Sequence, residues 1–198
     1  IDTIIDETLV SVDGEEDCSL AKVMHVSYKN EFICTNTKSN FWYVWAKHFW
    51  KEDDGGNEIR SKINEELKVK YFQKSTQLYP SRENGYNDFE SLEEEDEEEK
   101  KKKKNKLSRC YRIMQKCASS SNKSRIHREL AEQFRDRNSD FLDNVNKNPY
   151  LFCCKNGVID FEEKKFRDGR PDDYITIYSN VEYHPLTSEN KNIVDEIN

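Results

Sequence analysis

The stretch that decides the fold is NPYLFCCKNGVIDF, residues 148–161. An Asn-Gly pair between two apolar runs is typical of a β-hairpin, because a type I′ turn needs a positive φ at both central residues. With Asn156-Gly157 as the turn, Cys153 and Cys154 point to opposite faces of the hairpin, so neither is expected to form a metal or redox site. The expected cross-strand pairs are Lys155–Val158, Cys154–Ile159, Cys153–Asp160 and Phe152–Phe161, with an apolar face of Phe152, Cys154, Ile159 and Phe161.

Composition limits the class of protein. The chain has 198 residues, of which 34% are hydrophobic and 36% charged, and its net charge is −7. Six cysteines occur without a C-x-x-C pair, and the sequence contains neither a signal segment nor an apolar run of about 18 residues. We therefore expect an intracellular protein with reduced thiols, no membrane partner, and a chain that is an excised piece of a larger one.

The spacing of apolar residues along the rest of the chain, together with its turn residues and charge blocks, predicts an α+β fold. This fold is mainly helical, with two antiparallel β-hairpins and a disordered charged insertion. Residues 57–78 give the clearest helix, because Ile59, Ile63, Leu67 and Tyr71 recur every four residues. Further helices are expected at 17–29 (with Asp17 as N-cap), 107–118, 123–137 and from Ser139, a hairpin at 32–35 and 41–46, and a strand at 174–178.

A block of acidic residues followed by a block of lysines lies between two of these helices. Residues 93–99 are all acidic and residues 100–104 are all lysine. Segments of this composition bury too little apolar surface to offset the entropy of ordering, so residues 79–106 are expected to be a disordered insertion. The alternative is a helix in which the two blocks form i,i+4 ion pairs.

The sequence contains no recognisable catalytic or metal-binding motif. It has no G-x-S-x-G, H-E-x-x-H or G-x-x-x-x-G-K-[ST], and the H-x-E at His127 lacks the P-C-x-x-C of zinc deaminases. The aromatic run Phe41–Trp45 suits either base stacking or a hairpin core, and the alternation of a strand favours the core. We expect no catalytic residue, no metal ligand and no cofactor within this chain.

A basic segment gives the strongest functional signal. Residues 100–137 hold 14 basic and three acidic residues, a net charge of +11. A ridge of cations opposite an apolar stripe suits contacts with nucleic-acid phosphates, whereas the alternative is a solvated helix face neutralised by residues 93–99. The candidate DNA-binding residues are Arg109, Arg112, Lys116, Arg125 and Arg128 (the basic ridge), with Lys164, Lys165, Arg167 and Arg170 as a second basic cluster.

Two segments resemble a known family. Residues 148–185 contain N-G-V, F-R-x-G-x-P and D-Y-I, and residues 21–67 contain Trp42-Tyr43 and His48-Phe49-Trp50 ahead of a helix. This order is similar to the domain that precedes the ATPase in superfamily-3 helicases of the poxvirus and giant-virus primase–helicase type. The resemblance covers about residues 17–185 and does not include the charged tract.

The resemblance implies a helicase-associated domain at 17–185 and, at 186–198, the start of a connection to an ATPase. Residues 1–16 are acidic and irregular, and are interpreted as a leader or linker. The implied role of the domain is to link primase and hexameric helicase and to contact single-stranded or forked DNA, with self-association as a ring. ATP and Mg²⁺ would belong to the ATPase of the parent protein, at a viral replication site in the host cytoplasm. The alternative is a protein-interaction collar without DNA affinity. An independent nucleotidyl enzyme would need a carboxylate cluster, which the sequence lacks.

Overall fold

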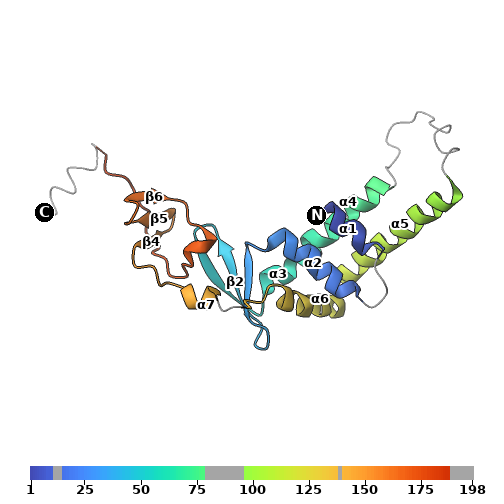
Figure 1. Ribbon diagram of the computed structural model, residues 1–198, viewed down its shortest axis with the longest axis horizontal. Coiled ribbons are helices and arrows are strands. Elements are labelled where there is room, and N and C mark those ends of the chain that lie inside the picture. Colours follow the sequence, from blue (N-terminus) through green and yellow to red (C-terminus); the bar gives the residue numbers. More distant parts are fainter. Residues whose placement is uncertain (11–14, 79–95, 138–139, 188–198) are drawn as a thin grey trace. The chain divides into compact units, whose positions relative to one another are not determined.

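The computed structural model describes residues 1–10, 15–78, 96–137 and 140–187 (Figure 1). The chain forms two compact units. The first unit consists of residues 1–43 and 53–136, and the second of residues 44–52 and 137–198. The expected α+β class, with a majority of helix and two small sheets, is confirmed.

The long helical segment that follows Gly56 organises the first unit. It consists of α3 (Asn57–Lys62), the π-helical stretch η1 (Ile63–Leu67) and α4 (Lys68–Leu78). The four residues of the predicted stripe, Ile59, Ile63, Leu67 and Tyr71, are all fully buried. A four-residue step overshoots one α-helical turn by about 40°. The wider π turn offsets part of this drift, so that the residues stay on one face.

The other helices of the first unit pack around this segment. Helix α4 packs against α5 (Glu97–Ala118), and α2 (Glu16–Tyr28) packs against α6 (Ser120–Gln133). The buried stripe of α5 consists of Cys110, Ile113 and Cys117, whereas Tyr111 is half exposed. The expected leader contains α1 (Asp2–Thr8), which buries Ile5.

The aromatic hairpin predicted at 32–46 is present as the first two strands of a sheet of order β1-β2-β3. These strands are β1 (Phe32–Asn36), β2 (Phe41–Ala46) and β3 (Phe49–Asp54), and the third was not expected. Trp42 is fully buried and its ring stacks on His127 with centroids 5.7 Å apart. The prediction that this run serves the core and not base stacking is therefore confirmed for Trp42.

Part of the charged tract is helical. Residues 97–106, expected in the disordered insertion, form the first half of α5, and Asp96 caps that helix by accepting a hydrogen bond from the backbone of Glu98. Lys100 pairs with Glu97 at 3.4 Å and Lys102 with Glu98 at 2.9 Å. For this part of the tract the helical alternative is correct. Residues 79–95 lie outside the described residues, as do Ser139 and all but the first two residues of the connection expected at 186–198.

The second unit contains α7 (Asp140–Asn144) and the sheet β4-β5-β6, followed by a 3₁₀ turn, η3 (Pro171–Asp173). The predicted hairpin is present as β4 (Leu151–Cys154) and β5 (Gly157–Asp160), but its register differs by two residues. Cys153 pairs with Val158 and Cys154 with Gly157, so the turn is Lys155-Asn156. A shift of two residues leaves the same side chains on each face, so Phe152, Cys154, Ile159 and Phe161 still share one face, but the core of this unit lies on the other face. The buried cluster consists of Cys153, Val158 and Ile175.

The third strand of this sheet is β6 (Lys165–Arg167), which the sequence patterns did not predict. Residues 174–178, expected to form a further strand, instead run as an extended segment without a place in the sheet. Asn146 holds this segment, because its side chain accepts a hydrogen bond from the backbone of Thr176 at 2.9 Å and donates one to the Thr176 hydroxyl at 2.6 Å.

Candidate nucleic-acid interface

The basic ridge lies in the first unit, where the α5–α6 pair meets the N-terminus of α2. Arg112 and Lys116 of α5 contact Glu16 at 3.0 and 2.8 Å, and Arg109 lies 3.9 Å from the same carboxylate. Asp17 contacts Lys116 at 2.5 Å and Arg125 of α6 at 2.9 Å. Two adjacent carboxylates thus bring together four of the five predicted cations. Of the fifth, Arg128, the structure shows an exposed side chain on α6.

Glu16 and Asp17 were not predicted as part of this site. The sequence indicated Asp17 as the N-cap of its helix, but the cap position is Glu15 and no side chain caps the helix. The only sequence signal for their role was an acidic pair at a helix N-terminus, which is usually explained by the helix dipole.

Exposure divides the ridge into two groups. The side chains of Arg109 and Lys116 are only 15% and 14% exposed, whereas those of Arg112 and Arg125 are 51% and 63% exposed. The first two therefore act mainly as partners of buried carboxylates. The exposed group, together with Arg128, has the access that a phosphate contact requires. Among the described residues, no carboxylate forms an ion pair with Arg128.

The charges of this cluster persist at neutral pH. Burial alone would raise the pKa of Glu16, but hydrogen bonds from Lys116 and Arg112 outweigh burial and hold that pKa below its usual value. Burial lowers the pKa of Lys116, and its hydrogen bonds to Asp17 and Glu16 reverse this effect and raise the pKa. Partly buried ion pairs of this kind are screened less by salt than exposed ones.

The second basic cluster lies in the second unit, and its members differ in their roles. The side chain of Arg167 is mostly buried and donates two hydrogen bonds of 2.8 Å to Asp173 and one of 3.1 Å to Asp160. These partners, Asp173 first, raise the pKa of Arg167 further above its usual value. Its guanidinium therefore closes the turn between β6 and η3. Lys164, Lys165 and Arg170 are exposed, and Lys165 pairs with Glu163.

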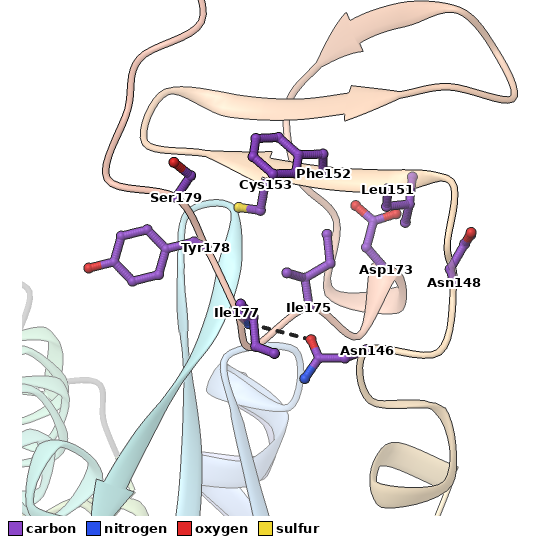
Figure 2. A pocket seen from close by; sticks show the side chains of 10 residues that line it. All are labelled: Asn146, Asn148, Leu151, Phe152, Cys153, Asp173, Ile175, Ile177, Tyr178 and Ser179. Carbon is purple, nitrogen blue, oxygen red and sulfur yellow. Dashed lines mark hydrogen bonds between the residues drawn. The ribbon is translucent and has the colours of Figure 1, made fainter.

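The second unit also contains a pocket of about 390 Å³ (Figure 2). Its lining combines β4 with the extended segment, and includes Leu151, Cys153, Ile175 and Tyr178. Burial raises the pKa of the Cys153 thiol to about 11, so the thiol is protonated at neutral pH and is a poor nucleophile. Cys153 is therefore not activated as a nucleophile in this pocket.

In residues 1–10, 15–78, 96–137 and 140–187, no group of three or more His, Cys, Asp or Glu side chains gathers in a way that would hold a metal ion. Within the same residues, no helix combines the length and apolar character needed to cross a membrane.

Comparison with known proteins gives a consistent result. The family model described as "D5 N terminal like" matches residues 21–197. "Putative helicase L207/L206" of Acanthamoeba polyphaga mimivirus is 30% identical over 173 residues, covering 87% of this chain and 17% of that protein. "Putative helicase 022R" of Frog virus 3 (isolate Goorha) is 26% identical over 185 residues, covering 83% and 19%. The chain spans less than a fifth of the length of either relative.

Proposed function

Because the chain belongs to the D5 N terminal like family, we propose that it is a non-catalytic accessory domain of a viral DNA-replication helicase. The observation that carries this proposal is the match over residues 21–197, together with two relatives whose names describe helicases of large DNA viruses. The domain would link a primase part and a hexameric helicase part of the parent protein, and would contact single-stranded or forked DNA.

ATP and Mg²⁺ are proposed for the helicase motor and not for this domain. The 198 residues contain no G-x-x-x-x-G-K-[ST] loop, whose backbone N–H groups and lysine would hold the phosphates. The residues present therefore do not fit the nucleotide, and no step of its hydrolysis is assigned to them.

For DNA contact, the exposed part of the basic ridge supports the proposal best. Arg112, Arg125 and Arg128 project from α5 and α6 of the same unit, and the six lysines of residues 100–106 continue the positive charge along α5. Contacts of this kind with phosphates do not depend on base sequence, and each neutralised phosphate releases counterions. Glu16 and Asp17 reduce the positive charge here, so we expect moderate affinity for DNA.

The test is binding of a fluorescent oligothymidine to the 198-residue chain. The triple variant R112Q/R125Q/R128Q is expected to bind roughly tenfold more weakly, whereas K38Q, which removes an exposed lysine from the β1–β2 turn, should bind like the wild type. Equal affinity of the triple variant and the wild type, or no binding by the wild type, would exclude DNA contact through this ridge.

The second candidate function is a protein-interaction collar without DNA affinity. The observation in its favour is that Glu16 and Asp17 already bind four cations of the ridge. A collar predicts self-association of a longer chain that carries both this domain and the motor, measured by sedimentation velocity, with no change when oligothymidine is added. A strictly monomeric longer chain would exclude it.

A further inference from the structure

One face of the sheet β4-β5-β6 carries aromatic side chains that the core does not use. Alternate residues of a strand point to opposite faces, so Tyr150, Phe152 and Phe161 share the face opposite the buried Cys153 and Val158. A backbone hydrogen bond of 2.9 Å from Phe161 to Tyr150 continues the register of the hairpin beyond the strands. Phe166 of β6 joins this face beside Ile159. We call Tyr150, Phe152, Phe161 and Phe166 the aromatic face.

The aromatic face is exposed. Tyr150 is 54% exposed, Phe152 47%, Phe161 55% and Phe166 37%. The apolar cluster of this unit lies on the other side of the sheet, around Val158 and Ile175. Soluble proteins rarely expose a contiguous group of large apolar side chains unless something binds there.

Local packing fixes the position of Phe166. A Cβ atom at Gly157 would lie 2.6 Å from the Phe166 ring, so only glycine allows the ring to lie over β5. The ring stacks on Tyr183 with centroids 4.5 Å apart and 27° between the planes. The Asn156 side chain donates to the Tyr183 carbonyl and accepts from its N–H, both at 2.9 Å. A stacked pair of rings is therefore preformed at one end of the face.

The chemistry of the face favours flat, aromatic ligands. Four of its side chains are rings on neighbouring strands, where facing residues lie roughly 5 Å apart. Single-stranded nucleic acids bind proteins by stacking their bases on aromatic residues of a sheet, independently of base sequence. A site for an apolar protein helix would instead be expected to hold a groove of aliphatic side chains.

The charges around the aromatic face are nearly balanced. Lys164 is exposed on the turn between β5 and β6, and among the described residues no carboxylate forms an ion pair with it. Lys155 and Lys165 are exposed as well, but they pair with Glu182 and Glu163. Glu162 on the same turn is exposed as well, so the charge around the face is nearly balanced. Base stacking would therefore dominate, and binding here would depend weakly on salt.

We propose that the aromatic face of the second unit binds unpaired bases of single-stranded DNA by stacking. The proposal rests on the proposed function for the choice of DNA as ligand. It adds a second contact of a different kind, because the basic ridge binds phosphates and the aromatic face binds bases.

The experiment compares an oligothymidine with an abasic oligonucleotide of the same length, which keeps the phosphates and lacks the bases. The test variant is F152L/F161L, which keeps apolar side chains on the sheet surface and removes two rings that make no buried contact with Gly157. The control is F72L, which changes an exposed phenylalanine on α4. Affinities are measured by fluorescence anisotropy, and sedimentation velocity reports self-association.

We expect F152L/F161L to weaken oligothymidine binding at least roughly fivefold, since one stacked base contributes about 1 kcal/mol or more. Its affinity for the abasic oligonucleotide should match that of the wild type, and F72L should change neither. Equal wild-type affinity for the two oligonucleotides would overturn the stacking proposal and leave the ridge intact. A wild-type dimer that F152L/F161L dissociates would also overturn it, because the face would then bind a second copy. Failure of both oligonucleotides to bind would refute DNA contact altogether.

Discussion

Glu16 is the residue whose removal tests the structure of the basic ridge most sharply. Its carboxylate is 12% exposed and accepts hydrogen bonds from Arg112 at 3.0 Å and Lys116 at 2.8 Å. The substitution Glu16→Gln keeps the shape of the side chain and removes its charge. A hydrogen bond to a charged group contributes about 1.5–3 kcal/mol, and breaking a buried ion pair costs about 3–5 kcal/mol.

Three features of the structure make the free-energy cost of Glu16→Gln smaller than that of breaking a fully buried ion pair. Arg112 is half exposed and can be solvated by water, and Lys116 keeps Asp17 as a partner at 2.5 Å. The amide of glutamine also still accepts one hydrogen bond. We therefore expect the free energy of unfolding to fall by about 2 kcal/mol, measured by urea denaturation followed by circular dichroism. Glu15→Gln is the matched control, because Glu15 is exposed and adjacent, and its cost should stay below about 0.5 kcal/mol.

The same substitution predicts a pH dependence and a change in DNA affinity. The pKa of Glu16 is lower in the folded protein than its ordinary value of 4.5, so its stabilising contribution is present above that value and is lost as the pH falls through the folded pKa. The wild type should therefore lose its advantage over Glu16→Gln in acid. At neutral pH the variant should bind oligothymidine more tightly, because one competing carboxylate is gone. A variant as stable as Glu15→Gln at neutral pH would refute this description of the cluster.

Three further predictions concern the core and the thiols. Leu67→Ala should lower the free energy of unfolding, measured by urea denaturation, by about 2–5 kcal/mol because Leu67 is fully buried. Val69→Ala, at an exposed position, should lower it by less than about 1 kcal/mol. Similar losses for the two variants would contradict the assignment of the buried stripe. Gly157→Ala should destabilise by about 1–3 kcal/mol because its Cβ would lie 2.6 Å from the Phe166 ring, and a neutral effect would contradict that packing. Cys153 should react with iodoacetamide at pH 8 far more slowly in the native chain than in the urea-unfolded chain, because burial raises its pKa to about 11. The two rates are measured by mass spectrometry, and equal rates would contradict the burial of Cys153.

Sequence periodicity predicted those elements in which one face is buried along the whole length. The stripe Ile59, Ile63, Leu67 and Tyr71 is fully buried, and helix 17–29 appears as α2 with a difference of one residue at each end. In both cases the local spacing of apolar residues already contains the information. A π-helical stretch inside the first of them did not disturb the prediction, because it keeps the four-residue step on one face.

The register of the β4–β5 hairpin could not be predicted from local turn chemistry alone. The Asn-Gly rule placed both residues in the turn, whereas Gly157 pairs with Cys154 within the sheet. Two contacts with distant residues accompany the observed register. The Asn156 side chain binds the backbone of Tyr183, and the ring of Phe166 covers Gly157. Phe166 lies nine residues after Gly157 and Tyr183 lies 27 residues after Asn156, and both separations are beyond the reach of a turn rule.

The candidate site shows the same limit. Charge counting identified the cations of the ridge, because a net charge of +11 over residues 100–137 is visible in the sequence. It did not identify Glu16 and Asp17 as their partners, since those residues lie about a hundred positions away and meet the ridge only when α2 packs beside α5 and α6. The sequence also placed Phe152 and Phe161 together on one apolar face, but it did not show that the core covers the opposite face, because Ile175, which packs against Cys153 and Val158, lies outside the hairpin.

The most direct test of the central claim, that this domain contacts DNA phosphates through the exposed cations of the ridge, is the salt dependence of oligothymidine binding. For single strands, the logarithm of the binding constant falls with the logarithm of the salt concentration by about 0.7 per phosphate neutralised. We expect the slope of R112Q/R125Q/R128Q to be shallower than that of the wild type by about two, for three lost contacts. The same slope for both proteins would contradict the claim.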